Sequence, residues 1–285
     1  MLINGFLAIN RLQELPKLAD YIHLYACGQA VDFMIGKIKF ILYEKNYWGT
    51  GFKSRLYDRL TPESYFESMR QTVSLLSGQR DLKILDAGCG TGLLLIFLED
   101  AFKKGCIYYG TDLLSAGLDR VKERARELGI LDRVTCFQSD LSESPPLKEN
   151  SIDIVITHFS IYTIFVNDKR QEALRNMYNV LRPGGLFIAS CPSKNYDADQ
   201  IIKESCELIR IKKGIWNAIL KRLFIYPLTK RLGLNFIQYQ LESGKWIAYT
   251  LEDLAGELRQ VGFEVGVSKS VYAGSAHLIC GHKPT

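Results

Sequence analysis

Short apolar runs alternate with amphipathic stretches between residues 82 and 190 of this 285-residue chain. Runs rich in Ile, Val, Leu, Phe and Tyr predict five buried strands, at 83–88, 106–112, 133–140, 152–158 and 185–190. The stretches between them place apolar residues three or four positions apart and predict helices over 92–103, 115–128 and 168–181. Regular alternation of strand and helix indicates a parallel sheet that is covered by helices on both faces.

The end of the chain repeats this pattern with one difference. Residues 250–262 predict a helix that begins at Thr250, and two strands follow over 263–271 and 275–281. Their short connection indicates an antiparallel pair. The predicted fold class is therefore α/β, a Rossmann-like doubly wound, mostly parallel seven-stranded sheet with an antiparallel last strand.

Two segments lie outside the strand–helix alternation. Residues 1–78 are helix-like and aromatic, and residues 191–249 are far longer than an ordinary strand–helix loop. We therefore predict an N-terminal helical segment (1–78), a ligand-binding core (79–190), an inserted helical lid or substrate subdomain (191–249) and a C-terminal completion of the core sheet (250–285). The first and third of these are expected to form the substrate pocket.

Composition narrows the class of protein. Hydrophobic residues make up 47% of the chain and charged residues 24%, as in globular proteins. No apolar run is long enough for a transmembrane helix, and the first residues do not form a signal peptide. The seven cysteines are scattered and lack C-x-x-C spacing, which argues against disulfides or structural zinc. We expect a cytoplasmic protein.

A glycine-rich turn, ILDAGCGTG at 84–92, follows the first predicted strand. Its third glycine comes one residue earlier than in the dinucleotide pattern G-x-G-x-x-G, and no lysine follows as in a P-loop. Asp86 at the strand end would repel a pyrophosphate but can accept hydrogen bonds from an ammonium group. The turn therefore predicts a ligand with a cationic end and no phosphate.

Two further acids stand at the ends of the next two strands. Asp112 can accept hydrogen bonds from both hydroxyls of a ribose, and Asp140 can accept one from an exocyclic amine such as that of adenine. Ribose, adenine and a cationic, phosphate-free tail together describe S-adenosylmethionine. The alternative for Asp112 is a helix-start acid, and for Asp140 a loop carboxylate.

Five motifs now resemble, in order and spacing, those of class I S-adenosylmethionine-dependent methyltransferases: ILDAGCGTG, YYGTD, VTCFQSDLSESPP, SIDIVITHFSIYTI and MYNVLRPGGLFIAS. The resemblance covers 80–190 strongly and 250–281 moderately, and it is closest to quinone-biosynthesis and natural-product enzymes. It implies S-adenosylmethionine as cofactor and S-adenosylhomocysteine as product. The cofactor-binding residues that it implies are Asp86, Gly88, Cys89, Gly90, Gly92, Asp112, Leu113, Asp140, Leu141 and His158.

The candidate catalytic residues are His158 and Tyr162, in the sequence HFSIYTI. Methyl transfer from a sulfonium is an in-line displacement in which the protein mainly supplies alignment. A base is needed only where the acceptor must lose a proton, and an unperturbed histidine titrates near 6.5. Packed side chains are the alternative for both residues. No metal-ligand cluster stands out, so a metal-free reaction is expected.

Basic residues concentrate in the insertion. Eight basic and two acidic residues between 203 and 231 give this segment a net charge of +6, against +5 for the whole chain. On a helical wheel, an apolar arc opposes Arg210 and Lys221; it consists of Leu208, Ile211, Ile215, Trp216, Ile219 and Leu223. Three interpretations remain: a lid over the pocket, an interfacial helix at an anionic membrane, or a nucleic-acid contact. The last is disfavoured because RNA-modifying enzymes show broader basic surfaces.

The expected function is therefore methyl transfer from S-adenosylmethionine to a small, hydrophobic or lipid-like acceptor, with peripheral membrane contact through 203–231. The alternatives are an RNA or protein methyltransferase that docks through the basic insertion, and a non-catalytic scaffold of the same fold. The intact glycine turn and the three acids argue against a scaffold. No feature of the sequence indicates the oligomeric state.

Overall fold

The computed structural model describes residues 47–53, 55–76 and 78–285. Gly49–Thr285 forms one compact unit, and the fold below is that of this unit. Positions 1–46 of the predicted N-terminal segment lie outside the described residues.

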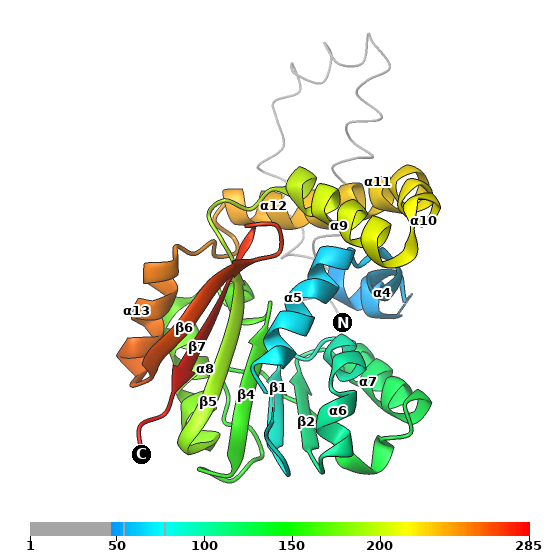
Figure 1. Cartoon of the computed structure of the whole chain (residues 1–285). Helices are drawn as coiled ribbons and strands as arrows, with labels where there is room; N and C mark the ends of the chain where they lie inside the picture. Colours follow the sequence, from blue (N-terminus) through cyan, green and yellow to red (C-terminus); the bar gives the residue numbers. More distant parts are fainter. Residues whose placement is uncertain (1–46, 54, 77) are drawn as a thin grey trace, which may run out of the picture. The chain divides into compact units, whose positions relative to one another are not determined.

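Seven strands form one sheet in the order β3-β2-β1-β4-β5-β7-β6 (Figure 1). The first five strands are parallel, and β7 runs antiparallel to both β5 and β6, which confirms the predicted fold class. The order reverses between β1 and β4, and sheets of this type bind ligands at that switch point. The strands are β1 Lys83–Ala87, β2 Ile107–Asp112, β3 Val134–Gln138, β4 Ile152–His158, β5 Leu181–Pro192, β6 Glu264–Val271 and β7 Ala276–His282.

Most core helices begin and end within two residues of their predicted positions. They are α7 Ser115–Glu127, α8 Asn167–Val180 and α13 Leu251–Val261, the last with the predicted Thr250 cap. The predicted helix 92–103 is instead a 3-10 turn, η2 (Leu93–Phe97), followed by α6 (Glu99–Lys103). Leu93, Leu94 and Leu95 are all buried, and three consecutive inward-facing side chains do not fit the one-sided apolar face of a regular surface helix.

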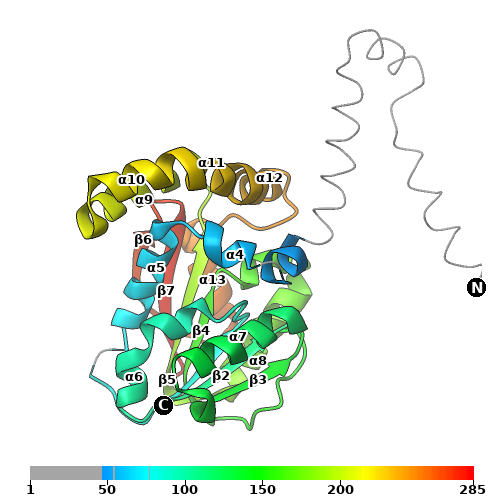
Figure 2. The ribbon, with the colours of Figure 1, turned by 90° about the vertical axis from the view of Figure 1, so that its right-hand side faces the viewer.

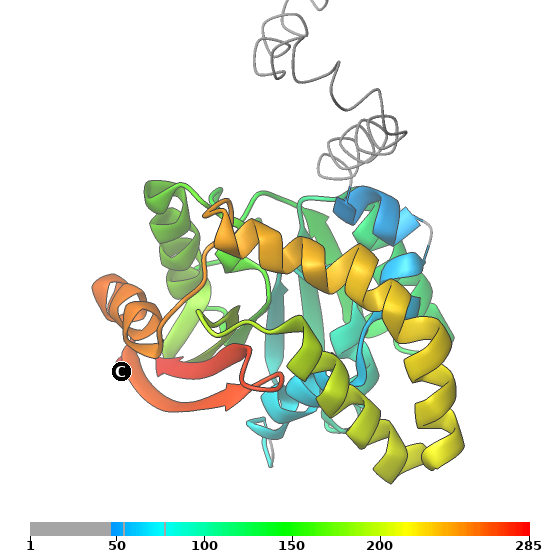
Figure 3. The same ribbon diagram turned by 90° about the horizontal axis from the view of Figure 1, so that it is seen from above.

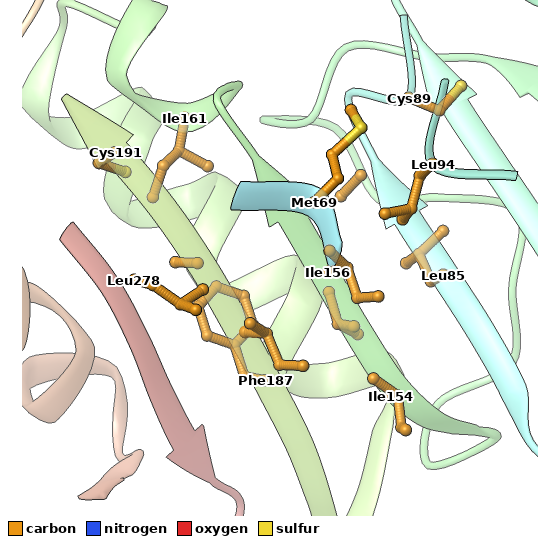
Figure 4. Packing of buried hydrophobic residues seen from close by; sticks show 14 of the residues in the cluster. Met69, Leu85, Cys89, Leu94, Ile154, Ile156, Ile161, Phe187, Cys191 and Leu278 are labelled. Atoms are coloured by element: carbon orange, nitrogen blue, oxygen red, sulfur yellow. The ribbon is translucent and has the colours of Figure 1, made fainter. Parts of the chain in front are cut away.

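The core lies between the sheet and its helices. Figure 4 shows side chains from β1, β4, β5 and β7 packed beside Met69, which belongs to α5 (Glu63–Ser74). The strands beside the switch point are apolar on both faces because helices cover both sides of the sheet. None of the helices among the described residues is both long and apolar enough to span a bilayer.

The insertion after β5 forms a helical layer across the edge where the parallel strands end (Figures 2 and 3). Gly214, with φ of 85°, separates its first two helices. In α9, Ser205 accepts a hydrogen bond from the Ser64 backbone N–H of α5 at 3.0 Å and donates one to the Ser64 hydroxyl at 2.9 Å. The layer consists of α9 Ala198–Lys213, α10 Ile215–Leu220, a π-helical turn Lys221–Ile225, α11 Tyr226–Thr229, a second π-helical turn Lys230–Leu234 and α12 Asn235–Glu242.

Candidate functional site

The glycine-rich turn lies at the switch point, directly after β1. Gly88, Gly90 and Gly92 have φ angles of 81°, 53° and 71°, the left-handed region that glycine enters without steric cost. The backbone N–H groups of Gly88 and Cys89 both donate to the Thr111 carbonyl, at 2.8 and 2.9 Å. The turn is therefore held against the end of β2.

Ser160, which follows β4, supports the turn from the other side. Its hydroxyl donates to the Ala87 carbonyl at 2.7 Å and shares a second, short hydrogen bond with the Thr157 hydroxyl. A Cβ atom placed on Gly88 would lie 2.3 Å from the Ser160 Cβ. The close approach of β1 and β4 at this point therefore requires glycine at position 88.

Asp112 ends β2 and directs its carboxylate back to the glycine turn. Oδ2 accepts a hydrogen bond from the Gly90 N–H and Oδ1 accepts one from the Leu114 N–H, both at 2.9 Å. Burial raises the pKa of this carboxyl, and the backbone N–H donors of Leu114, Gly90 and Leu113 oppose that rise. The N-cap residue of α7 is Leu114, and no side chain, that of Asp112 included, caps this helix. The side chain of Leu113, another predicted cofactor-binding residue, is exposed.

Asp86 is the most deeply buried of the three acids. Its Oδ2 accepts a hydrogen bond from the Tyr108 hydroxyl at 2.7 Å, and only 3% of the residue is exposed. Burial raises its pKa to about 7, although the hydrogen bond from Tyr108 lowers the pKa in part. This carboxyl, next to the start of the glycine turn, therefore takes up a proton more readily than an exposed aspartate does.

Asp140 and Leu141 follow β3 at the same edge of the sheet. Oδ1 of Asp140 accepts hydrogen bonds from the backbone N–H of Ser142 at 2.9 Å and from its hydroxyl at 2.8 Å, which lower the pKa of the carboxyl. The Leu141 carbonyl accepts a hydrogen bond from the Asn176 side chain of α8 at 3.1 Å. The loop is thus anchored to α8, and both hydrogen bonds that the Asp140 carboxylate accepts within the described part of the chain go to Oδ1.

His158 ends β4 inside a cluster of aromatic rings. Its Nε2 lies 3.0 Å from the Ser68 hydroxyl of α5, and its ring meets Tyr65 and Phe159 edge-on with centroids 5.0 and 4.8 Å apart. Burial lowers its pKa to about 3, so the ring is neutral at pH 7. Nδ1 is buried and has no hydrogen-bond partner among the residues that the structure describes.

Tyr162, the second candidate catalytic residue, is buried in the same cluster. Its ring packs edge-on against Phe159 and against Trp246, with centroids 6.4 and 5.5 Å apart. The Tyr162 carbonyl also accepts a hydrogen bond from the Ile247 N–H at 3.0 Å. Phe159 is therefore the shared neighbour of both candidate catalytic side chains, and the end of the insertion contacts one of them.

The depressed pKa of His158 predicts a pH-dependent stability. Because the unfolded chain binds the proton more readily, the stability due to the neutral ring is complete above about pH 6.5 and is lost as the pH falls toward 3. Between pH 7.5 and 5 the wild type should lose about 2 kcal/mol of unfolding free energy through this group. Urea unfolding of His158→Gln at the same two pH values should show no such loss of unfolding free energy. Equal losses in both proteins would contradict the assignment.

Three contacts of the site have no signal in the sequence. Asp58, in α4 (Leu56–Leu60), accepts hydrogen bonds from the Thr91 hydroxyl of the glycine turn and from Arg124 of α7, each at 2.6 Å. Ser68 contacts His158, and Ser160 supports the turn. All three contacts join segments far apart in the chain, and the spacing of residues along the sequence gives no sign of such contacts.

Among residues 47–53, 55–76 and 78–285, no three His, Cys, Asp or Glu side chains are grouped as metal ligands.

The chemistry of this edge fits S-adenosylmethionine. Asp112 uses one lone pair of each oxygen for the backbone and keeps acceptor capacity for hydroxyl groups. The buried His158 Nδ1 and the Ser190 hydroxyl, on paired positions of β4 and β5, have no hydrogen-bond partner within the described part of the chain. Neutral aromatic rings surround this end of β4, and a ring face attracts a cation such as a sulfonium.

Comparisons with known proteins agree with this geometry. Residues 84–185 match the family described as a methyltransferase domain. The bifunctional biotin biosynthesis protein BioHC of Teredinibacter turnerae is 26% identical over 63% of this chain and 31% of its own length. The ubiquinone/menaquinone biosynthesis C-methyltransferase UbiE of Pseudoalteromonas translucida is 31% identical over 42% of this chain and 46% of its own. The chain thus spans less than half the length of these two curated relatives.

The fold is shared with a solved methyltransferase. Geranyl diphosphate C-methyltransferase of Streptomyces coelicolor, in complex with Mg²⁺, geranyl diphosphate and S-adenosylhomocysteine, superposes with a TM-score of 0.52. It is 14% identical, and the match covers 76% of this chain and 79% of that one. At 14% identity, this similarity concerns the fold alone. The matched family, the sheet order and the glycine turn agree with one another: residues 84–185 are similar to a methyltransferase domain, and the fold is that of solved S-adenosylmethionine-dependent methyltransferases.

Proposed function

We propose that this protein transfers the methyl group of S-adenosylmethionine to a small, apolar acceptor. The observation that carries the proposal is the connection that Ser160 makes between the glycine turn and the end of β4. Ser160 contacts Ala87 of the turn, and His158 with its aromatic neighbours stands two residues earlier. A cofactor on the turn would therefore present its sulfonium to the aromatic cluster.

Each part of the cofactor has a candidate partner. Asp112 would accept hydrogen bonds from the ribose hydroxyls, and Asp140 with Leu141 would hold the adenine. The turn and Asp86 would receive the methionine end, whose ammonium group suits a carboxylate. With its pKa near 7, Asp86 would ionise fully once that ammonium is bound, because an opposite charge favours the ionised form.

The surroundings of His158 favour an apolar acceptor. Tyr65, Phe159 and Tyr272 are in mutual ring contact around it, and Trp246 of the insertion extends the cluster through Tyr162. The described part of the N-terminal segment contributes Tyr65 and Ser68, so both this segment and the insertion would line the acceptor site. Two of the three compared proteins are named for quinone biosynthesis and for geranyl diphosphate, which are of the same chemical class.

The chain's own residues would act mainly by alignment. The donor is already activated, and holding the acceptor in line with the methyl group is worth up to about 7–11 kcal/mol. A neutral His158 would accept a hydrogen bond from the acceptor at Nδ1 while Ser68 holds Nε2. Tyr162 would support the ring stack, and no step of this reaction requires a metal.

The test is cofactor binding followed by turnover. Calorimetric titration should detect S-adenosylmethionine, and the absence of binding at millimolar ligand would remove the proposal. Release of S-adenosylhomocysteine should then be faster with a prenylated quinol than with transfer RNA or an arginine-rich peptide. Faster turnover of RNA or peptide would instead favour a macromolecular acceptor.

Variants of His158 and Tyr162 distinguish a role in orienting the acceptor from a role in proton transfer. His158→Gln keeps a hydrogen-bonding group toward Ser68 but removes the ring. If the imidazole only orients the acceptor, KM should rise several-fold while kcat falls less than about tenfold. A fall of kcat by 100-fold or more with unchanged KM would assign the proton transfer to His158. Tyr162→Phe should leave both constants near the wild-type values.

A further inference from the structure

The outer end of the insertion carries apolar side chains that face away from the protein. Eight of the eighteen large apolar side chains that are exposed in the described residues lie between positions 211 and 228. We call residues 210–228 the amphipathic ridge. Trp216 and Phe224 are its exposed aromatic members, 75% and 66% exposed. The other six are Ile211, Ile215, Ile219, Leu220, Leu223 and Leu228.

The orientation of this ridge is fixed by a small buried cluster on its inner side. Ile209, Ala218 and Tyr226 pack together beneath it, separate from the main core. With these three residues turned inward, the apolar residues between them point outward. Ile211, Trp216 and Leu223 of the predicted apolar arc are exposed, so these three side chains cover no pocket in this structure, while the insertion as a lid or substrate subdomain stays a prediction.

Basic side chains are interleaved with the apolar ones. Arg210 pairs with Glu207, and Lys212 forms ion pairs with Glu67 at 2.7 Å and Glu63 at 3.6 Å. Lys213, Lys221 and Arg222 form no ion pair within the described part of the chain. The ridge thus combines exposed aromatic and aliphatic groups with an excess of positive charge, at one end of the helical layer (Figures 2 and 3).

We propose that the amphipathic ridge docks on an anionic lipid membrane. An interfacial helix binds by burying apolar side chains at the headgroup boundary while its lysines and arginines meet anionic lipids. Nucleic acid would neutralise the charges but would leave Trp216, Phe224 and their neighbours in water. A second copy of the chain is disfavoured as the partner, because a symmetric interface would bring together two sets of unpaired cations, from Lys213, Lys221 and Arg222, which repel one another. Membrane docking goes beyond the proposed methyl transfer and does not depend on it.

Vesicle flotation of the full chain tests the proposal without reference to activity. Wild-type protein should float with vesicles of phosphatidylcholine and phosphatidylglycerol at about three to one, and less with phosphatidylcholine alone. The anionic preference should weaken as salt is raised, because salt screens exposed charges. The double change Trp216→Ser and Phe224→Ser should reduce binding to anionic vesicles at least tenfold, as should Lys213→Glu with Arg222→Glu.

Matched controls lie outside the ridge. Val267→Ser removes an equally exposed apolar side chain from β6, and Lys122→Glu with Arg126→Glu makes the same change of net charge on α7. Both controls should bind anionic vesicles like the wild type, and circular dichroism should show all variants folded. The proposal fails if wild-type protein stays unbound, if ridge and control variants bind equally, or if the ridge variants only convert a dimer into monomers.

Discussion

Gly88→Ala should unfold the protein at a temperature where the wild type is stable, or leave a folded protein that does not bind S-adenosylmethionine. The new methyl group would lie 2.3 Å from the Ser160 Cβ and 2.9 Å from its hydroxyl oxygen. The backbone at position 88 also has φ of 81°, a conformation that costs an L-residue roughly 1–2 kcal/mol. We expect a total loss of about 2–5 kcal/mol of unfolding free energy, since overpacking adds a further 1–3 kcal/mol.

Two companion variants distinguish the cost of the positive φ from the cost of the clash with Ser160. Gly129→Ala has a comparable φ of 69° but no atom within 4 Å of the new Cβ, so it should cost only the backbone preference. Gly88→Ala combined with Ser160→Gly removes the clash but also the Ser160 hydrogen bonds to Ala87 and Thr157, so it should recover only part of the lost stability. Urea denaturation of the three proteins measures the differences. A loss in Gly88→Ala no larger than in Gly129→Ala would show that the contact with Ser160 is not tight in solution.

The strands and the glycine turn were predictable because their signals are local. The run Ile152–His158 has apolar residues at 152 and 154–156, and every position except 153 is buried, as a strand covered on both faces requires. The spacing of Gly88, Gly90 and Gly92 after Asp86 likewise depends on a few adjacent residues. These local features, taken together, were sufficient to predict the α/β fold class and the edge of the sheet that carries the candidate site.

The remaining features depend on which segments meet in space. The apolar arc of the insertion has the same periodicity whether it faces the core or the solvent, and only the inward packing of Ile209 and Ala218 decides between them. The neutral state of His158 follows from burial beside Tyr65 and Ser68, ninety residues away in the chain. Its ordinary pKa of about 6.5 therefore suggested a readily protonated base that the folded environment does not provide.

Asp112→Ala should weaken S-adenosylmethionine binding about 100-fold, which corresponds to about 2.7 kcal/mol. The change removes the carboxylate proposed for the ribose hydroxyls, and hydrogen bonds to a charged group contribute about 1.5–3 kcal/mol each. It also leaves the Gly90 and Leu114 N–H groups without their acceptor, so the turn itself should loosen. Unfolding free energy should fall by about 1–3 kcal/mol, and the titration therefore belongs well below the melting temperature.

Asp112→Asn and Asp119→Ala make the result interpretable. Asparagine keeps one acceptor oxygen for a backbone N–H but presents an amide donor where the second acceptor stood, so its affinity should lie between those of the wild type and Asp112→Ala. Asp119 is an exposed acid of α7, and its removal should leave cofactor affinity unchanged. If Asp112→Ala lost stability yet bound the cofactor as tightly as the wild type, Asp112 would serve only to hold the glycine turn. The ribose would then have to be bound by other groups at the carboxyl end of β2.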